Sequence, residues 1–312
     1  MSAGRRSGGW SVAGRLVISL MLLWLVSRYV DVDAVRQRLS ALSPGWVALG
    51  LAISVLQVGV LAWRWRYTAG RLGIDLPLRK ALGEYYLGIL LNQVLPGGVT
   101  GDVSRAWRHA RSDAPTGPAV RAVILERASA QVVMTLAAVA SVLVLPWASG
   151  AYRMAAAVAT AVLLGLVVSV LARRPASDSD LGRFRADTRR ALFARQALAA
   201  QLTSAVLVVA SYVVVFVIAG RAVGIETPLA ILLPLVAPVL MTMLVPVTVA
   251  GWGIREAAAT ALWGLVGLTP EDGAAISVAY GLLVLVSSAP GLVVLMWALI
   301  GDRGRRGHRP PT

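Results

Sequence analysis

The stretch NQVLPGGVTGDVSRAWR, Asn92–Arg108, interrupts an apolar chain with one proline, three glycines, an aspartate and two arginines. Proline and glycine weaken helices, because proline lacks an N–H group and glycine loses more conformational entropy than other residues. A charge within a bilayer costs at least about 2.5 kcal/mol, so charges beside such a break suggest a function. The stretch is therefore either a loop between two spans or a non-helical element that handles a polar group at membrane depth.

The composition of the chain indicates an all-α, polytopic integral membrane protein. Of its 312 residues, 57% are hydrophobic and 14% are charged, whereas soluble domains carry about 25% charged residues. Six apolar segments approach the roughly 17–25 residues that a spanning helix needs. They are Leu16–Val30, Trp46–Trp63, Val132–Trp147, Met154–Ala172, Leu198–Gly220 and Ala274–Ile300.

The net charge of +15 would suggest nucleic acid as the partner of a soluble chain. Here the arginines lie between apolar segments and at both termini, where the positive-inside rule accounts for them. We therefore expect no nucleic-acid partner, a multi-pass location in the cell membrane and cytoplasmic N- and C-termini. Anionic membrane lipids are the expected partners of the basic surface.

The residue types exclude several chemistries. The chain has no cysteine and only two histidines, His109 and His308, so we expect no metal site. It contains no Walker motif, no zinc-binding HExxH and no recognisable nucleophile–base pair. No cofactor is expected, and the enzyme class is uncertain, with a non-enzyme favoured.

The first broken segment is expected to be a re-entrant hairpin. Its apolar part, Leu82–Leu95, has about fourteen residues, which is short for a span. Basic residues flank it on both sides, with Arg79 and Lys80 before it and Arg105 and Arg108 after it. Basic flanks on both sides suit a segment that enters from the cytoplasm and returns there.

A second broken segment, Ile231–Val249, is expected to be interrupted by Pro234, Pro238 and Pro246. Acidic residues flank this segment, so we expect a hairpin that enters from the side of the membrane opposite to the cytoplasm. We thus predict about six spans plus two oppositely oriented hairpins, with eight ordinary spans as the alternative. We expect residues 1–312 to form a single transmembrane domain, with 12–300 embedded in the membrane and 301–312 as a basic cytoplasmic tail.

The windows PGGVTGDVSR, Pro96–Arg105, and PVTVAGWGIRE, Pro246–Glu256, share a pattern of proline, glycines and a charged pair that contains arginine. Interrupted segments at corresponding positions in two halves indicate the binding site of a transporter, and they are compatible with an inverted repeat. A helix that restarts after a glycine turn directs its N–H groups at the break, which suits an anion. Arg105 and Arg255 would add charge and a planar donor fork suited to phosphate.

Spacing predicts how the charged residues pair. Asp102 and Arg105 share a helix face and can pair, whereas Arg255 and Glu256 are adjacent, so each is expected to need a partner elsewhere. The pair Glu126–Arg127 opens the span after the first hairpin. The alternative for all these groups is that they are helix-end charges whose side chains reach out to water.

The segment Trp63-Arg64-Trp65-Arg66-Tyr67 ends the second span and is typical of a membrane–water border. We predict no catalytic residue. The predicted substrate-binding residues are Pro96, Gly97, Gly98, Gly101, Asp102, Arg105, Glu126, Arg127, Pro246, Gly251, Gly253, Arg255 and Glu256.

With these motifs, the chain resembles the lysylphosphatidylglycerol synthase transmembrane region, also described as the flippase-like domain family. Three segments carry the resemblance: LPGGVTGDVSRAW (Leu95–Trp107), LERASA (Leu125–Ala130) and PVTVAGWGIREAA (Pro246–Ala258). Thr100 stands where the family has the first glycine of Gly-Gly-Asp, and Ser129-Ala130 replaces a frequent Leu-Gly step.

The resemblance implies translocation of a lipid with a polar or anionic head group, either a phospholipid or a polyprenyl-linked lipid. Only the basic tail follows the last apolar segment, so aminoacyl transfer is not expected. Two alternatives stay open: an intramembrane lipid-modifying transferase with Asp102 or Glu256 as its base, and a membrane scaffold for a glycosyltransferase partner.

Overall fold

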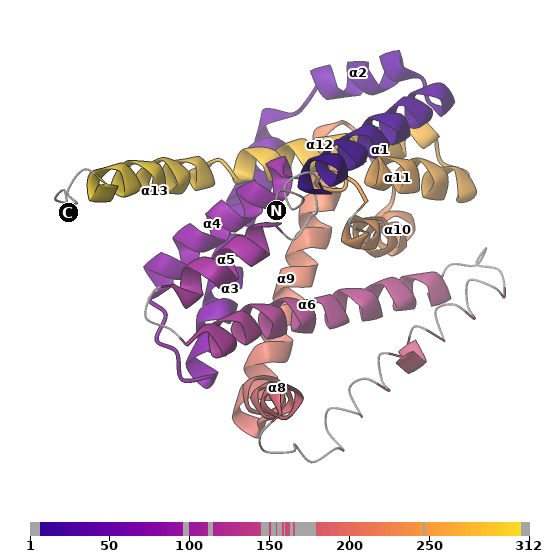
Figure 1. Cartoon of the computed structure of the whole chain (residues 1–312). Helices are drawn as coiled ribbons and strands as arrows, with labels where there is room; N and C mark the ends of the chain where they lie inside the picture. Colours follow the sequence, from indigo (N-terminus) through magenta and orange to yellow (C-terminus); the bar gives the residue numbers. More distant parts are fainter. Residues whose placement is uncertain are drawn as a thin grey trace.

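The computed structural model describes residues 7–95, 100–111, 115–144, 179–245 and 247–306, with a few single positions between 150 and 165. The chain is an all-α polytopic membrane protein, as predicted (Figure 1). Its longer helices are α1 (Ser7–Tyr29), α3 (Pro44–Arg71), α4 (Leu78–Val94), α6 (Thr116–Val144), α9 (Arg195–Ala222), α10 (Leu229–Met241), α11 (Ile254–Leu265), α12 (Pro270–Ser287) and α13 (Pro290–Arg306). The shorter elements are α2 (Val32–Ser40), α5 (Thr100–Ala110), α8 (Asp180–Thr188), η1 (Arg189–Phe193) and η2 (Thr242–Leu244).

Five apolar stretches among the described residues are long enough to cross a membrane. They are Val12–Tyr29, Pro44–Arg71, Thr116–Leu143, Arg195–Ala222 and Pro270–Ile300. Five of the six predicted spans are therefore confirmed as long apolar stretches. The sixth, Met154–Ala172, falls almost entirely outside the described residues.

Helix α9 runs through the centre of the molecule, packed along α3 and crossed by α6 (Figure 1). Its Phe216 is fully buried, with its ring centroid 5.3 Å from that of Tyr280 and 6.3 Å from that of Trp263. Small residues let the surrounding helices approach: a Cβ added at Gly50 would lie 3.2 Å from Ile218, and one at Gly220 would lie 3.3 Å from Ile276. Close packing of this kind replaces the hydrophobic driving force that is missing within a bilayer.

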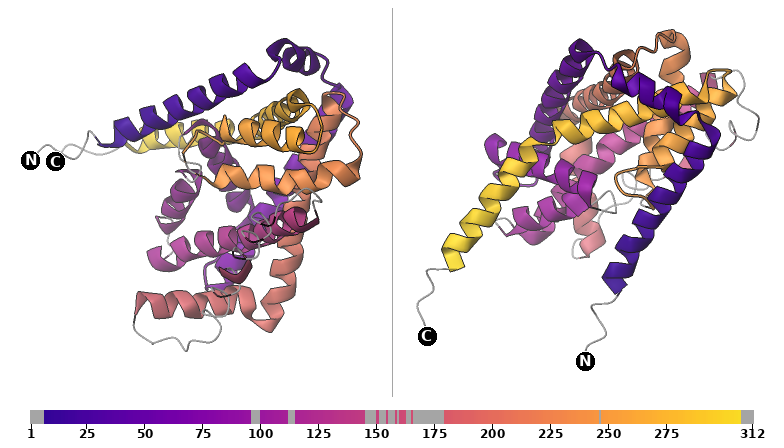
Figure 2. Two further views of the ribbon diagram at one scale, coloured as in Figure 1. Left: turned by 90° about the vertical axis from the view of Figure 1, so that its right-hand side faces the viewer. Right: turned by 90° about the horizontal axis from the view of Figure 1, so that it is seen from above.

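The two terminal helices, α1 and α13, project from the outside of the bundle (Figure 2). Helix α1 packs on α11, and α13 packs on α4. Apolar residues of α1 are exposed, including Val17 at 62% and Leu20 at 65%. These exposed residues suit contact with lipid, because α1 is both apolar and long enough to span.

The first broken segment is a helical hairpin made of α4 and α5. The helices approach most closely at Gly88 and Gly101, where a Cβ on Gly101 would overlap the carbonyl oxygen of Gly88. The amide of Gly101 donates a hydrogen bond of 2.7 Å to Asn92 Oδ1 at the end of α4. Two predicted site glycines of the turn, Gly97 and Gly98, and Pro96 lie outside the described residues.

The second broken segment is the hairpin of α10, η2 and α11. The expectation that Pro234 and Pro238 interrupt the first arm is wrong, because both lie inside α10. A proline removes one backbone donor, and in a membrane helix the surrounding groups can satisfy the freed carbonyl. The break instead follows Met241 and ends at Gly253, the residue directly before α11.

The turn before α11 is built from residues with positive φ, Ala250 at 52°, Gly251 at 80° and Gly253 at 91°. Left-handed backbone is strained for residues with a Cβ, and this explains the two glycines. Pro246 lies outside the described residues. The opposite orientation of the two hairpins in the membrane stays a prediction.

Two other expectations need correction. The predicted last span, Ala274–Ile300, is divided between α12 and α13, with the break just before Pro290. The connection Asp31–Pro44 between the first two predicted spans, which we expected to be a loop with charges of both signs, contains helix α2. The carboxylate of Asp31 starts α2 because it accepts hydrogen bonds from the amides of Asp33 and Ala34.

Candidate functional site

The charged pair Glu126–Arg127 lies in the middle of α6. We expected it to open a span, but α6 begins ten residues earlier, at Thr116. Glu126 is completely buried, so it is not a helix-end charge that reaches water. A buried charge within an apolar helix needs partners, and three neighbouring helices supply them.

Two helices of the first hairpin contact the Glu126 carboxylate. Tyr85 of α4 donates a hydrogen bond of 2.7 Å to Glu126 Oε2, and Arg105 of α5 lies 3.2 Å from the same oxygen. Arg105 also lies 3.1 Å from Asp102 Oδ1, which confirms the predicted pairing of these two residues. The hairpin is thus fixed to α6 by a buried ion-pair network.

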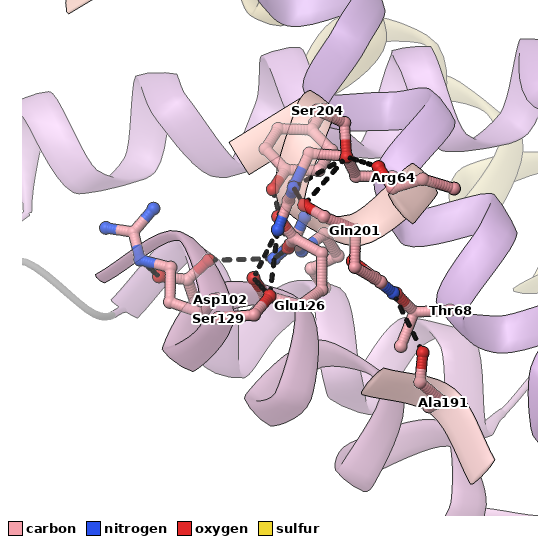
Figure 3. A network of polar contacts seen from close by, with 12 residues as sticks. Arg64, Thr68, Asp102, Glu126, Ser129, Ala191, Gln201 and Ser204 are labelled. Atoms are coloured by element: carbon pink, nitrogen blue, oxygen red, sulfur yellow. Dashed lines mark hydrogen bonds and ion pairs between the residues drawn. The ribbon is translucent and has the colours of Figure 1, made fainter. Parts of the chain in front are cut away.

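Arg64 of α3 approaches Glu126 from the other side, with Nε 3.9 Å from Oε1 (Figure 3). Its terminal nitrogens donate hydrogen bonds of 2.7 Å to Ser204 Oγ and 2.8 Å to Ser129 Oγ. Arg64 was not among the predicted site residues, because Trp63–Tyr67 was expected to lie at a membrane border. Arg64 is completely buried, since α3 continues beyond this segment and turns Arg64 toward the core.

Aromatic rings enclose the Arg105 guanidinium. Its Cζ lies 4.0 Å from the ring centroid of Tyr85 and 4.6 Å from that of Trp65. Arg105 is only 2% exposed, and cation–π contacts are strongest for a cation that has lost its water. Neither Tyr85 nor Trp65 was among the predicted site residues.

Arg127 differs from the other two arginines. Its Nε lies 3.4 Å from Asp102 Oδ2, and its side chain is 44% exposed, whereas those of Arg64 and Arg105 are at most 1% exposed. Asp102 therefore bridges Arg105 and Arg127. Among these partners of Glu126 and Asp102, Arg127 is the cation that an incoming group can reach.

A cavity of about 190 Å³ lies beside Glu126 and Arg127. Both hairpins contribute to its wall, with Asn92 and Gln93 from the end of α4 and Met243 and Ala250 from the second break. The other lining residues are Gln57, Val58, Leu61, Ile89, Ala130, Gln131, Met134, Val208, Val209, Tyr212, Leu240, Leu244, Tyr280, Val284 and Ser287. The wall combines apolar side chains with convergent polar groups, as is typical of ligand sites.

The second motif forms its own buried cluster, and here one expectation was wrong. Arg255 and Glu256 do pair, with Arg255 Nη2 2.7 Å from Glu256 Oε1. Glu256 lies in the first turn of α11 and reaches back, so that its Oε2 accepts a hydrogen bond of 2.7 Å from the Gly253 amide. Ser277 Oγ completes the cluster with a hydrogen bond of 2.8 Å to Glu256 Oε1.

Arg255 lies one layer behind the cavity. Its Cζ is 5.3 Å from the ring centroid of Tyr280, and its Nη1 is 3.9 Å from Met243 Sδ. Tyr280 and Met243 both line the cavity. A Cβ at Gly281 would collide with the Arg255 guanidinium, so this glycine makes room for the buried arginine.

Side chains of the protein itself accept the amide hydrogens at both helix restarts. Asn92 accepts from Gly101, and Glu256 accepts from Gly253. We expected these helix starts to face a bound anion. In this structure Asn92 Oδ1 and a Glu256 oxygen take the place of that anion at the two helix starts. Side-chain oxygens are good acceptors for the free amides of a helix N-terminus.

The predicted site residues fall into two groups. The described members of the first motif and of the pair on α6 form one cluster: Gly101, Asp102, Arg105, Glu126 and Arg127. The second cluster contains Gly251, Gly253, Arg255 and Glu256. Glu126 and Arg127 of the first cluster line the cavity, whereas the second cluster lies behind Met243 and Tyr280, which do. The role of both clusters in substrate binding stays a prediction.

The ion pair of Glu84 and Arg108 between the arms of the first hairpin was not predicted. Arg108 Nε and Nη2 each lie 2.8 Å from a different oxygen of Glu84. Two parallel contacts of this kind fix orientation as well as distance. Their separation of 24 residues gives no local signal, because the pair forms only when the hairpin closes.

The fold and the site define a polytopic membrane domain in which two broken helical hairpins flank an amphiphilic cavity with buried ion pairs. The chain belongs to the lysylphosphatidylglycerol synthase TM region family, which matches residues 12–291. This range contains both hairpins and the pair Glu126–Arg127. A search of curated proteins found no match.

Proposed function

We propose that this protein translocates a lipid with a polar or anionic head group between the leaflets of the cell membrane. The head group occupies the cavity between the hairpins, while the lipid chains stay in the bilayer. The observation that carries the proposal is the position of Arg127. This arginine lies eleven residues after the start of α6, an apolar helix that is long enough to span, and it lines a cavity that both hairpins share.

The roles of the site residues follow from their burial. Arg127 contacts the head group directly, because its guanidinium is the accessible one. Arg105 and Arg255 are at most 2% exposed, so in this conformation they hold the hairpins in place. Asp102 and Glu256 keep those arginines in their positions through the ion pairs described above.

The glycines of the site have a mechanical role in this proposal. Gly101 and Gly253 sit where one backbone contacts another element with no room for a side chain. A head group that moves across the membrane needs the hairpins to shift relative to the spans. Close, side-chain-free contacts allow such sliding with few side chains to rearrange.

The described residues give little support to the transferase alternative. Its candidate bases are Asp102 and Glu256. Asp102 contacts two guanidinium groups, and Glu256 contacts Arg255, Ser277 and a backbone amide. Carboxylates held in this way are suited to positioning cations, since a general base needs a free approach to the proton that it removes.

Exchange of labelled lipids in proteoliposomes tests the proposal. The protein is expected to speed the exchange of anionic lipids between the leaflets above the rate in protein-free liposomes. A transferase would instead change the mass of the lipid when a donor is supplied. A scaffold would do neither, and exchange at the protein-free rate for both phospholipids and polyprenyl-linked lipids would refute translocation.

A further inference from the structure

The charges of the first cluster do not balance. Among the residues that the structure describes, the three guanidinium groups of Arg64, Arg105 and Arg127 face only the two carboxylates of Asp102 and Glu126. The cluster therefore carries one surplus positive charge. Such a surplus is costly within a membrane unless a negative group arrives from elsewhere.

The other ion pairs on these elements are each neutral. Glu84 forms a bidentate ion pair with Arg108, and Glu256 forms an ion pair with Arg255. These two pairs do not offset the surplus of the first cluster. The uncompensated charge thus belongs to the group of five residues beside the cavity.

The surplus is presented to the cavity by Arg127. Within the part of the chain that the structure describes, its guanidinium makes the 3.4 Å ion pair with Asp102 and no hydrogen bond. Its terminal nitrogens are therefore available to a ligand. A planar guanidinium fork matches a phosphate in both charge and geometry.

Uncharged hydrogen-bonding groups line the same cavity as this cation. Four carboxamides line the cavity, those of Gln57, Asn92, Gln93 and Gln131. The Gln131 amide lies 3.0 Å from the Met241 thioether, and a thioether is a weak acceptor. Gln131 can exchange this partner for a hydroxyl group of a ligand, whereas Gln57 Nε2 donates a hydrogen bond of 2.8 Å to Ser211 Oγ and Asn92 Oδ1 accepts one from the Gly101 amide.

The lining offers little to a second charge. Of the described residues that line the cavity, only Glu126 and Arg127 are charged. A diphosphate would bring at least two negative charges against one accessible guanidinium. An aminoacyl ammonium would need a carboxylate that it can reach, but Glu126 is completely buried. Its Oε2 accepts hydrogen bonds from Tyr85 and Arg105, and its Oε1 lies 3.9 Å from Arg64 Nε.

We propose that the cavity selects lipids whose head group is one phosphodiester joined to an uncharged, hydroxyl-bearing group. The phosphodiester neutralises the surplus charge at Arg127, and the carboxamides bind the hydroxyls. Two lipid sources have this chemistry, a glycerol phospholipid and an isoprenoid phosphosugar. The inference rests on the proposed function, since it assigns the substrate class of the same cavity.

Lipid binding to the full-length protein in detergent tests the selection without transport. Four lipids are titrated and followed by native mass spectrometry: phosphatidylglycerol, a polyprenyl phosphohexose, a polyprenyl diphosphohexose and an aminoacylated phosphatidylglycerol. At least one of the two phosphodiesters is expected to bind about tenfold more tightly than the last two lipids, the discrimination expected from one charged contact. Which phosphodiester binds identifies the source.

Substitutions locate the selection at the surplus charge. Arg127→Gln is expected to weaken phosphodiester binding roughly ten- to a hundredfold. Arg183→Gln removes the same charge from α8, where the Arg183 side chain is 60% exposed, and is expected to change nothing. Asp102→Asn adds a second surplus charge and is expected to strengthen diphosphate binding relative to phosphodiester binding.

The inference is overturned if the diphosphate or the aminoacylated lipid binds wild type as tightly as the phosphodiesters, or if none of the four binds. An unchanged affinity of the Arg127→Gln protein also overturns it. If that variant does not fold, Asp102→Asn decides, because it predicts a shift of preference toward diphosphate. Selective binding without lipid exchange would leave this inference standing and refute translocation, whereas exchange without this selectivity would do the reverse.

Discussion

Arg105 Nη2 lies 3.2 Å from Glu126 Oε2 in a site where both side chains are at most 1% exposed. The contact joins α5 of the first hairpin to the middle of α6 across 21 residues of sequence. Any displacement of the hairpin must break this ion pair or replace it. The proposed movement of a head group and the stability of the fold therefore depend on the same carboxylate.

Glu126→Gln is expected to lower the stability of the protein by about 3–5 kcal/mol, because it leaves buried guanidinium groups without their carboxylate. Thermal unfolding in detergent measures this loss. The matched control is Asp180→Asn on α8, whose fully exposed side chain lies 4.0 Å from Arg183, and it is expected to leave the midpoint nearly unchanged. Equal midpoints for the two variants would contradict the buried network.

The close contact of α4 and α5 gives an asymmetric prediction. Gly101→Ala is expected to destabilise by about 1–3 kcal/mol or more, because its Cβ would overlap the Gly88 carbonyl. Gly88→Ala is the control, since its Cβ would meet Gly101 O at an ordinary 3.5 Å. Thermal midpoints that fall equally for both would show that the hairpin does not close in this way.

The spans and the charged motifs could be predicted from the sequence because their signals are local. Asp102 and Arg105 are three apart in a helix, so their pairing followed from spacing. The burial of Arg64 could not be predicted, because an arginine between two tryptophans also marks a membrane border. Its partners Ser129 and Ser204 lie on other helices, and only tertiary packing brings them together.

Local geometry also explains the errors around the second motif. Adjacent residues in a helix interior point apart, but Glu256 sits in the first turn of α11 and folds back over the helix start. This leaves its second oxygen within reach of Arg255. Pro234 was expected to break a helix, yet α10 continues through it, because a single lost hydrogen bond is tolerated within a membrane bundle.

Gly253→Ala is expected to destabilise the turn before α11 more than Gly267→Ala destabilises its own turn. Both glycines have positive φ, 91° and 75°, which costs a residue with a Cβ about 1–2 kcal/mol. A Cβ at Gly253 would in addition lie 2.8 Å from Ser19 O on α1, while one at Gly267 meets nothing within 4 Å. The thermal unfolding midpoints of the two variants are compared. A smaller fall of the midpoint for Gly253→Ala than for Gly267→Ala would contradict the packing of α1 against this turn.

Single cysteines can test the orientation of the hairpins, since the chain has none of its own. With two hairpins, Thr116→Cys is expected to react with a membrane-impermeant thiol reagent only from the cytoplasmic side, and Glu226→Cys only from outside. Eight ordinary spans would place both positions on the opposite sides. The cysteine-free wild type controls for non-specific labelling.

The most direct test of the central claim compares lipid exchange by wild type, Arg127→Gln and Arg183→Gln at equal amounts of folded protein in liposomes that contain labelled phosphatidylglycerol. If Arg127 contacts the head group in the cavity, Arg127→Gln is expected to slow exchange at least about tenfold, while Arg183→Gln exchanges lipid at the wild-type rate. Wild-type exchange by the Arg127→Gln protein, or an equal loss in both variants, would contradict the assignment of the cavity as the translocation site.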